Sequence, residues 1–210
     1  MNRFQMLLCA CMIAAANAVG QVTDLSAMKP KDYAGYCIQQ LKTGALVVRL
    51  NFKTKAINAL LQAGNSNGAS EIRYQQELLN STIIKAFRKN FKFCPVYFVS
   101  YDSSMALVQG RLTGIFLNDN LEPDPSLKLP SDFFLFAEYG MIENTIPPDK
   151  LNPDQETSTR GLMEDALVIR DKDMQLLRDP FPYYVHTGNW DSRVKKLNKK
   201  FDKFYQLSML

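Results

Sequence analysis

Two apolar segments separated by a long helical pattern constrain the fold more than any other feature of this sequence. Residues 45–50 read Ala-Leu-Val-Val-Arg-Leu, and residues 94–101 read Cys-Pro-Val-Tyr-Phe-Val-Ser-Tyr; both are rich in strand-forming side chains. Between them, apolar residues recur every three or four positions as far as Phe91, with a break at residues 64–68. This order predicts two parallel strands joined by a helical crossover.

Later segments predict the rest of the sheet. Residues 113–117, 133–139 and 166–170 are apolar runs of strand length, and the connections between them do not contain helices of crossover length. An amphipathic helix is expected from Asp191 onward, and a short helical turn over residues 171–177. We therefore expect an α/β fold of the α+β variant: a mixed sheet of about five strands, covered by a long interrupted helix and a C-terminal helix.

The N-terminus predicts export. Residues 1–3 carry the charge of Arg3, residues 4–16 are almost wholly apolar, and Ala16-Asn17-Ala18 forms a cleavage signal, which is the pattern of a secretory signal peptide. We expect a signal peptide at 1–18, a leader with a short helix at 19–44, and a single α/β domain at 45–210 located in the periplasm. Lipid anchoring at Cys11 is the alternative, because residues 8–11 loosely resemble a lipobox.

Charge and hydropathy argue against two classes of partner. The net charge of +4 is too weak to indicate a nucleic-acid-binding protein, which needs a concentrated basic stripe. No apolar run of about 18 residues follows the signal, so we expect no transmembrane segment in the mature chain. The basic C-terminal helix could lie on an anionic membrane, but docking of its apolar stripe on the domain core is the favoured interpretation.

Cysteine and histidine usage limits the chemistry. Cys37 and Cys94 remain after the signal, and an oxidising compartment makes them candidates for a disulfide, with two buried thiols as the alternative. His186 is the only histidine and no Cys-x-x-Cys pair is present in the mature chain, so we expect no metal. The glycines lack the spacing of phosphate-binding loops, so no nucleotide cofactor is expected either.

Glu138 is the weak candidate for a catalytic residue. It sits at the end of an apolar strand, where a carboxylate loses water and needs a cation to remain charged. Arg49 and Arg170 stand near the ends of neighbouring predicted strands and could supply that cation. One interpretation makes Glu138 an acid or a ligand-binding group. The favoured one makes it part of an ion pair with Arg49 and Arg170 at the edge of the sheet.

Four segments in this order resemble a group of small uncharacterised exported proteins of Bacteroides-like Gram-negative bacteria: residues 45–50 with the lysine-rich helix start that follows, 93–98, 136–140 and 178–185. The resemblance spans most of the mature chain and implies residence in the periplasm. It also marks residues 178–185 as characteristic, with Arg178, Tyr183 and Tyr184 as candidates for a partner-binding surface on a turn stiffened by prolines.

These observations leave three hypotheses for function. The favoured one is an exported periplasmic or envelope-associated protein that binds a protein or small-molecule partner without catalysis. The alternative is a carboxylate-dependent hydrolase that uses Glu138 and another acid. The second alternative is a thiol redox protein that uses Cys94, which lacks a nearby resolving cysteine.

The export hypothesis predicts the mass of the mature protein. Expressed in a Gram-negative host, the chain should be recovered with the intact mass of a protein that begins at Val19, and Ala18→Arg should block this cleavage. A chain beginning at Cys11 with attached acyl groups would establish lipid anchoring instead. A full-length chain beginning at Met1 would contradict export.

Overall fold

The computed structural model describes residues 28–144 and 162–210. The predicted signal peptide, the lipidation alternative at Cys11 and most of the long loop at 143–161 lie outside the described residues. The elements, in chain order, are α2 (Pro30–Thr43), β1 (Ala45–Leu50), α3 (Thr54–Gln62), α4 (Ser66–Asn90), β2 (Val96–Ser100), α5 (Met105–Val108), β3 (Phe116–Leu117), β4 (Phe134–Asn144), β5 (Leu162–Arg170), β6 (Tyr184–Val185) and α6 (Trp190–Ser208).

One mixed sheet organises the molecule, with strand order β3-β2-β1-β4-β5-β6. β1 lies between β2 and β4 and runs parallel to both, while β3, β5 and β6 pair antiparallel to their neighbours. The α+β class predicted from the sequence is confirmed. The described sheet has six strands rather than about five, because the short segment Tyr184–Val185 adds an edge strand beside β5.

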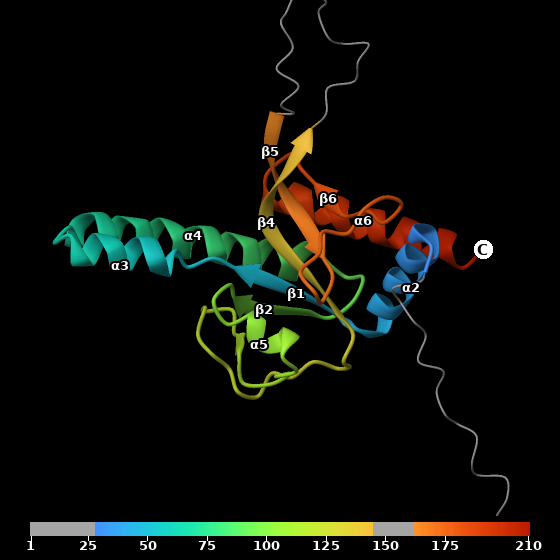
Figure 1. Cartoon of the computed structure of the whole chain (residues 1–210), viewed down its shortest axis with the longest axis horizontal. Helices are drawn as coiled ribbons and strands as arrows, with labels where there is room; N and C mark the ends of the chain where they lie inside the picture. The colour runs from blue at the N-terminus through green and yellow to red at the C-terminus, as the bar shows by residue number, and fades with distance from the viewer. Residues whose placement is uncertain (1–27, 145–161) are drawn as a thin grey trace, which may run out of the picture.

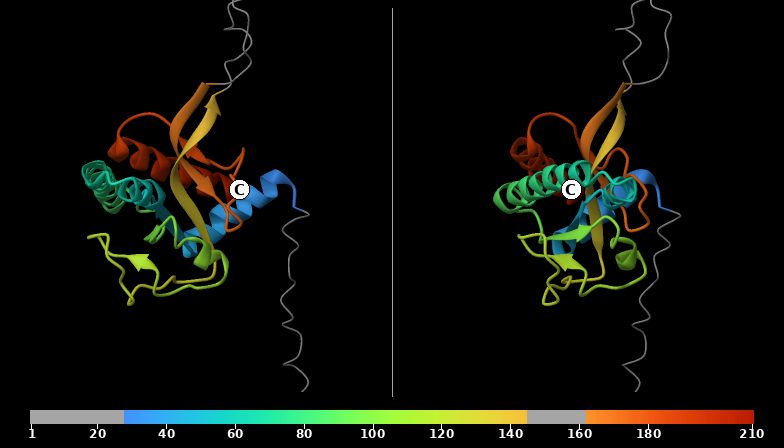
Figure 2. Two further views of the ribbon diagram at one scale, coloured as in Figure 1. Left: turned by 60° about the vertical axis from the view of Figure 1, so that its left-hand side comes forward. Right: turned by 90° about the vertical axis from the view of Figure 1, so that its left-hand side faces the viewer.

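Helices α2, α4 and α6 cover one face of the sheet (Figures 1 and 2). Phe87 of α4 and Phe201 of α6 are fully buried there, and the ring centroid of Phe87 lies 6.3 Å from that of Phe98 on β2. Ile38 and Leu41 of α2 belong to the same core, so the short helix predicted ahead of the domain packs on the sheet. The opposite face is closed by α5 and by the loop at 109–133, with Phe136 and Leu129 in its core.

Helix α6 docks on the domain, as favoured from the sequence. Val194, Leu197 and Phe201, its apolar stripe, are completely buried, and Asn189 caps its first turn by accepting from the Ser192 N–H at 3.0 Å. Within the described residues, no helix combines the length and the apolar character needed to cross a membrane.

The interrupted helix is also confirmed: α3 and α4 lie side by side and project from the sheet as a hairpin (Figure 1). The helical turn predicted over 171–177 is wrong. Those residues form a tight turn in which the Asp171 carboxylate accepts from the Gln175 N–H at 2.8 Å, and Leu176 pairs back with Arg170. The aspartate therefore closes a strand turn rather than capping a helix.

Candidate functional site

Glu138 is buried in the middle of the sheet, and both of its carboxylate oxygens are bonded to guanidinium groups. Arg49 Nη1 donates to Oε2, and Arg170 Nε donates to Oε1 at 2.5 Å. The side chains of Arg49 and Glu138 are 6% and 10% exposed, and that of Arg170 is 29% exposed. These residues, here called the Arg–Glu–Arg cluster, therefore form a largely desolvated ionic network.

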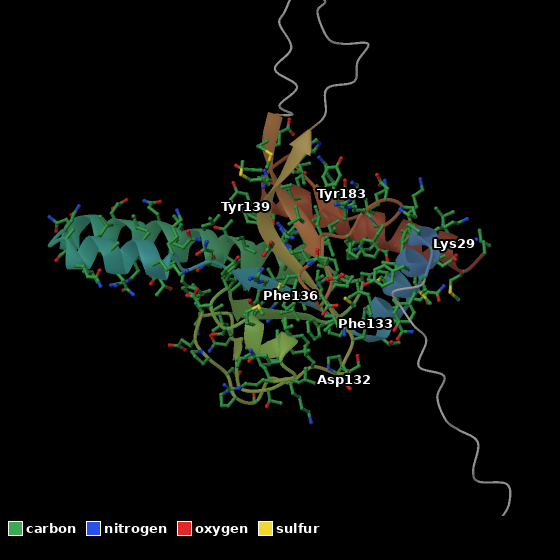
Figure 3. The ribbon with its side chains drawn as sticks, viewed as in Figure 1. Lys29, Asp132, Phe133, Phe136, Tyr139 and Tyr183 are labelled. Atoms are coloured by element: carbon green, nitrogen blue, oxygen red, sulfur yellow. The ribbon has the colours of Figure 1, made fainter. Side chains whose placement is uncertain are left out.

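Strand register brings the cluster together. Arg49 on β1 is directly opposite Glu138 on β4. On β5, Arg170 is opposite Phe136, which lies two residues before Glu138 and therefore points to the same face of the sheet. Phe136 and Tyr139, labelled in Figure 3, mark this stretch of β4. The expected position at the sheet edge is wrong, because β5 and β6 extend the sheet beyond β4 and leave the Arg49–Glu138 pair between two central strands.

The turn after β2 fixes the guanidinium of Arg49. Arg49 Nε donates to Ser104 Oγ at 3.0 Å, and the same hydroxyl donates to the Tyr101 carbonyl at 2.7 Å. The Arg49 guanidinium also stacks on the ring of Tyr101, 3.8 Å from its centroid. Tyr101 is in turn anchored to β1, since its N–H donates to the Leu50 carbonyl at 2.8 Å. Arg49 is thus held by a cation–π contact and two hydrogen bonds.

The turn after β5 fixes Arg170 in a similar way. Arg170 Nη1 donates to the Met174 carbonyl at 3.1 Å. Met174 has a φ of 62°, the left-handed conformation that side chains other than glycine rarely adopt. The turn maintains this conformation through a bond from the Met174 N–H to the Asp171 carbonyl at 3.1 Å. The strained residue therefore supplies one of the acceptors that position Arg170.

A pocket of about 470 Å³ opens above the cluster. It lies at the carboxyl ends of the parallel strands β1 and β2, where ligands usually bind in open α/β sheets. Its volume is within the range of ordinary small-molecule sites. The pocket is lined by the three cluster residues and by Tyr101, Asp102, Met105 and Met174.

The hydrogen bonding of Glu138 favours binding over proton transfer. Both of its oxygens already accept from guanidinium donors, which a reacting group would have to displace. Asp102 is the other carboxylate in the pocket; it is exposed and accepts from Thr54 Oγ1 at 2.8 Å. The cluster itself carries a net charge of +1, from two guanidinium groups and one carboxylate.

Cys37 and Cys94 are both buried free thiols, so the structure shows the second of the two states expected for them and not the candidate disulfide. Cys37 faces Tyr33 on α2. Cys94 lies near Lys42, which follows Cys37 by five residues and is therefore about 7.5 Å further along that helix. Burial raises the pKa of Cys37 to about 11 and that of Cys94 to about 12, with the Lys42 charge opposing the latter shift only in part. Both groups are therefore protonated thiols near neutral pH.

The remaining predicted residues lie away from the pocket. Tyr183 and Tyr184 pack on one another with ring centroids 4.8 Å apart, and both are half-buried. Arg178 is exposed and lines a separate hollow beside α2. His186 Nδ1 lies 2.8 Å from Glu164 Oε2, a structural contact between β5 and the segment after β6. None of these residues lines the pocket above the cluster.

Neither a group of metal ligands among the described residues nor a similar protein identifies what this site binds. Over residues 28–144 and 162–210, no group of three or more His, Cys, Asp and Glu side chains is arranged to hold a metal ion. Comparison of the chain with models of protein families, with curated proteins and with solved structures finds no match.

Sequence reasoning missed the residues that the loops contribute, namely Tyr101, Asp102, Ser104, Met105 and Met174. One signal was available for most of them. The polar run at 101–104 directly follows the strand β2, and residues at the carboxyl end of a parallel strand are favoured positions for a site.

We expect Glu138→Gln to lower the free energy of unfolding by about 3 kcal/mol or more, because it leaves two desolvated guanidinium groups without a counter-charge. Chemical denaturation measures this loss. Asp119→Asn is the matched control, since it breaks an exposed ion pair with Arg88 and should cost less than about 1 kcal/mol. Equal losses in the two variants would contradict the structural importance of the cluster.

The buried thiols predict a decline of stability in alkali. Above about pH 9, the unfolded chain loses its thiol protons while native Cys94 keeps its own up to a pKa of about 12. Unfolding free energy should therefore fall between pH 8 and pH 10, by about 1–2 kcal/mol for this one group. Cys94→Ala should show a smaller fall, measured by denaturation at both pH values. Absence of free thiols in the unfolded chain would contradict the assignment.

Proposed function

We propose that this protein is exported to the cell envelope of a Gram-negative bacterium and acts there as a non-catalytic binding protein. The resemblance of residues 45–50, 93–98, 136–140 and 178–185 to exported Bacteroides-like proteins supports the location, together with the signal-peptide pattern of residues 1–18. The ligand site of this proposal is the pocket above the Arg–Glu–Arg cluster.

One observation carries the proposal: a largely buried ionic network forms the floor of a ligand-sized pocket, and its carboxylate is fully engaged by cations. Fixed polar groups that converge on a partly apolar pocket are the usual construction of a small-molecule site. Their rigidity favours binding, because donors held by other contacts lose little freedom when a ligand arrives.

A carboxylate-dependent hydrolase is the second candidate, because Asp102 and Glu138 line the same pocket. It has less support, since hydrolases of this kind need one carboxyl group that donates a proton. The thiol redox alternative has the least support. A protonated thiol is a poor nucleophile, and burial holds both cysteines in that state.

A pocket-filling variant tests the binding proposal. We expect a deproteinised small-molecule extract of Gram-negative cells to raise the melting temperature of the purified protein, because a ligand of the native state stabilises it. Met105→Trp should abolish this rise, since Met105 lines the pocket and is 49% exposed, which leaves room for a larger side chain. Met209→Trp, at a position 64% exposed and outside the pocket, should preserve it.

Mass spectrometry of the same extract separates binding from catalysis. Binding predicts that every component is recovered unchanged after incubation. Consumption of a component by the wild type but not by Glu138→Gln would support the hydrolase instead. Absence of any melting-temperature rise that depends on the pocket would contradict the binding function.

A further inference from the structure

The two arginines of the cluster have hydrogen-bonding capacity that the protein does not use. A guanidinium carries five N–H donors. Arg49 donates to Ser104 and Glu138, and Arg170 donates to Glu138 and the Met174 carbonyl. Within the described residues no further acceptor is bonded to either side chain, and both line the pocket. Because an unpaired N–H in a partly desolvated place is unfavourable, the remaining donors require water or the acceptor atoms of a ligand.

The charge of the cluster sets the charge of that ligand. Two guanidinium groups and Glu138 give the cluster a net charge of +1, and the exposed carboxylate of Asp102 brings the lining of the pocket as a whole to zero. A ligand with one negative charge therefore disturbs this balance less than one with two. A carboxylate carries one negative charge and also matches the planar fork of a guanidinium. A phosphate dianion would bring a second negative charge close to Glu138 and to Asp102, the other acid of the pocket. The electrostatics therefore favour a monocarboxylate over a phosphate.

The walls of the pocket favour a ligand with an apolar portion. Met105 and Met174 line it with flexible thioether side chains, which adapt to aliphatic groups. Met174 is kept in the pocket wall by a turn that holds its backbone in the left-handed conformation at φ 62°. Backbone strain of this kind persists where surrounding contacts impose it and is concentrated at binding sites.

We infer that the pocket binds a small aliphatic monocarboxylic acid, with its carboxylate on the unused donors of Arg49 and Arg170 and its carbon chain against Met105 and Met174. This inference rests on the proposed binding function and names its ligand class. The carboxylate approaches the N–H groups that Glu138 leaves unbonded, in the plane of each guanidinium, and does not displace Glu138, whose two oxygens remain bonded.

Calorimetric titration of the full chain tests the inference, with propionate and butyrate as probes and with chloride and inorganic phosphate at equal ionic strength as comparisons. We expect saturable binding of the two carboxylates. Arg170→Gln should weaken it at least about tenfold, the equivalent of one charge-assisted hydrogen bond. Arg73→Gln is the matched control, because Arg73 is exposed on α4 outside the pocket and its loss should leave binding unchanged.

Met105→Trp keeps the test decisive if Arg170→Gln fails to fold, since it blocks the pocket without touching the cluster and should abolish carboxylate binding. Phosphate binding as tight as that of butyrate would overturn the carboxylate assignment, as would equal binding by the wild type and Met105→Trp. The extract could instead contain a ligand whose effect depends on the pocket and which neither propionate nor butyrate displaces. That result would overturn this inference but leave the proposed binding function standing. If neither the extract nor the two carboxylates produce an effect that depends on the pocket, the proposed binding function is overturned as well.

Discussion

The buried contact between Glu138 and two guanidinium groups is the interaction on which the rest of this structure depends. It joins β1, β4 and β5 through their side chains, and through Ser104 and Met174 it also fixes the turns that follow β2 and β5. Removing three charges from water is costly, and the cost is offset only while all the partners are in place. The network therefore links strand register, turn conformation and the shape of the pocket.

Much of the fold could be predicted because burial leaves a direct trace in the sequence. β1 is buried at every residue, and its sequence is accordingly an apolar run broken only by Arg49. Glu138 interrupts β4 in the same way, and Arg170 ends the run of β5. A charged residue inside an apolar strand must have a partner, so these three residues could be grouped before their geometry was known.

The rest of the site could not be predicted, because loops position it through backbone geometry. Ser104 bonds Arg49 through a hydroxyl in a turn, and Met174 bonds Arg170 through its backbone carbonyl. Neither contact is visible in the regular spacing of apolar residues from which strands and helices are predicted. The sequence leaves the state of Cys37 and Cys94 open for a similar reason, since a cysteine count and a compartment do not give the distance between two thiols. The central position of the ion pair also depended on the strand order, which the sequence left open.

Side-chain NMR of the arginines tests the central claim most directly. In the ¹⁵N-labelled full chain, the account predicts slowly exchanging Nε–H signals from Arg49 and Arg170, because Ser104 and Glu138 accept from them. Propionate should move both signals together in a saturable manner while that of exposed Arg73 stays in place. Rapid exchange of both Nε–H groups would contradict an ordered pair of arginines. Signals that do not move when propionate is added would contradict the binding of a carboxylate by that pair.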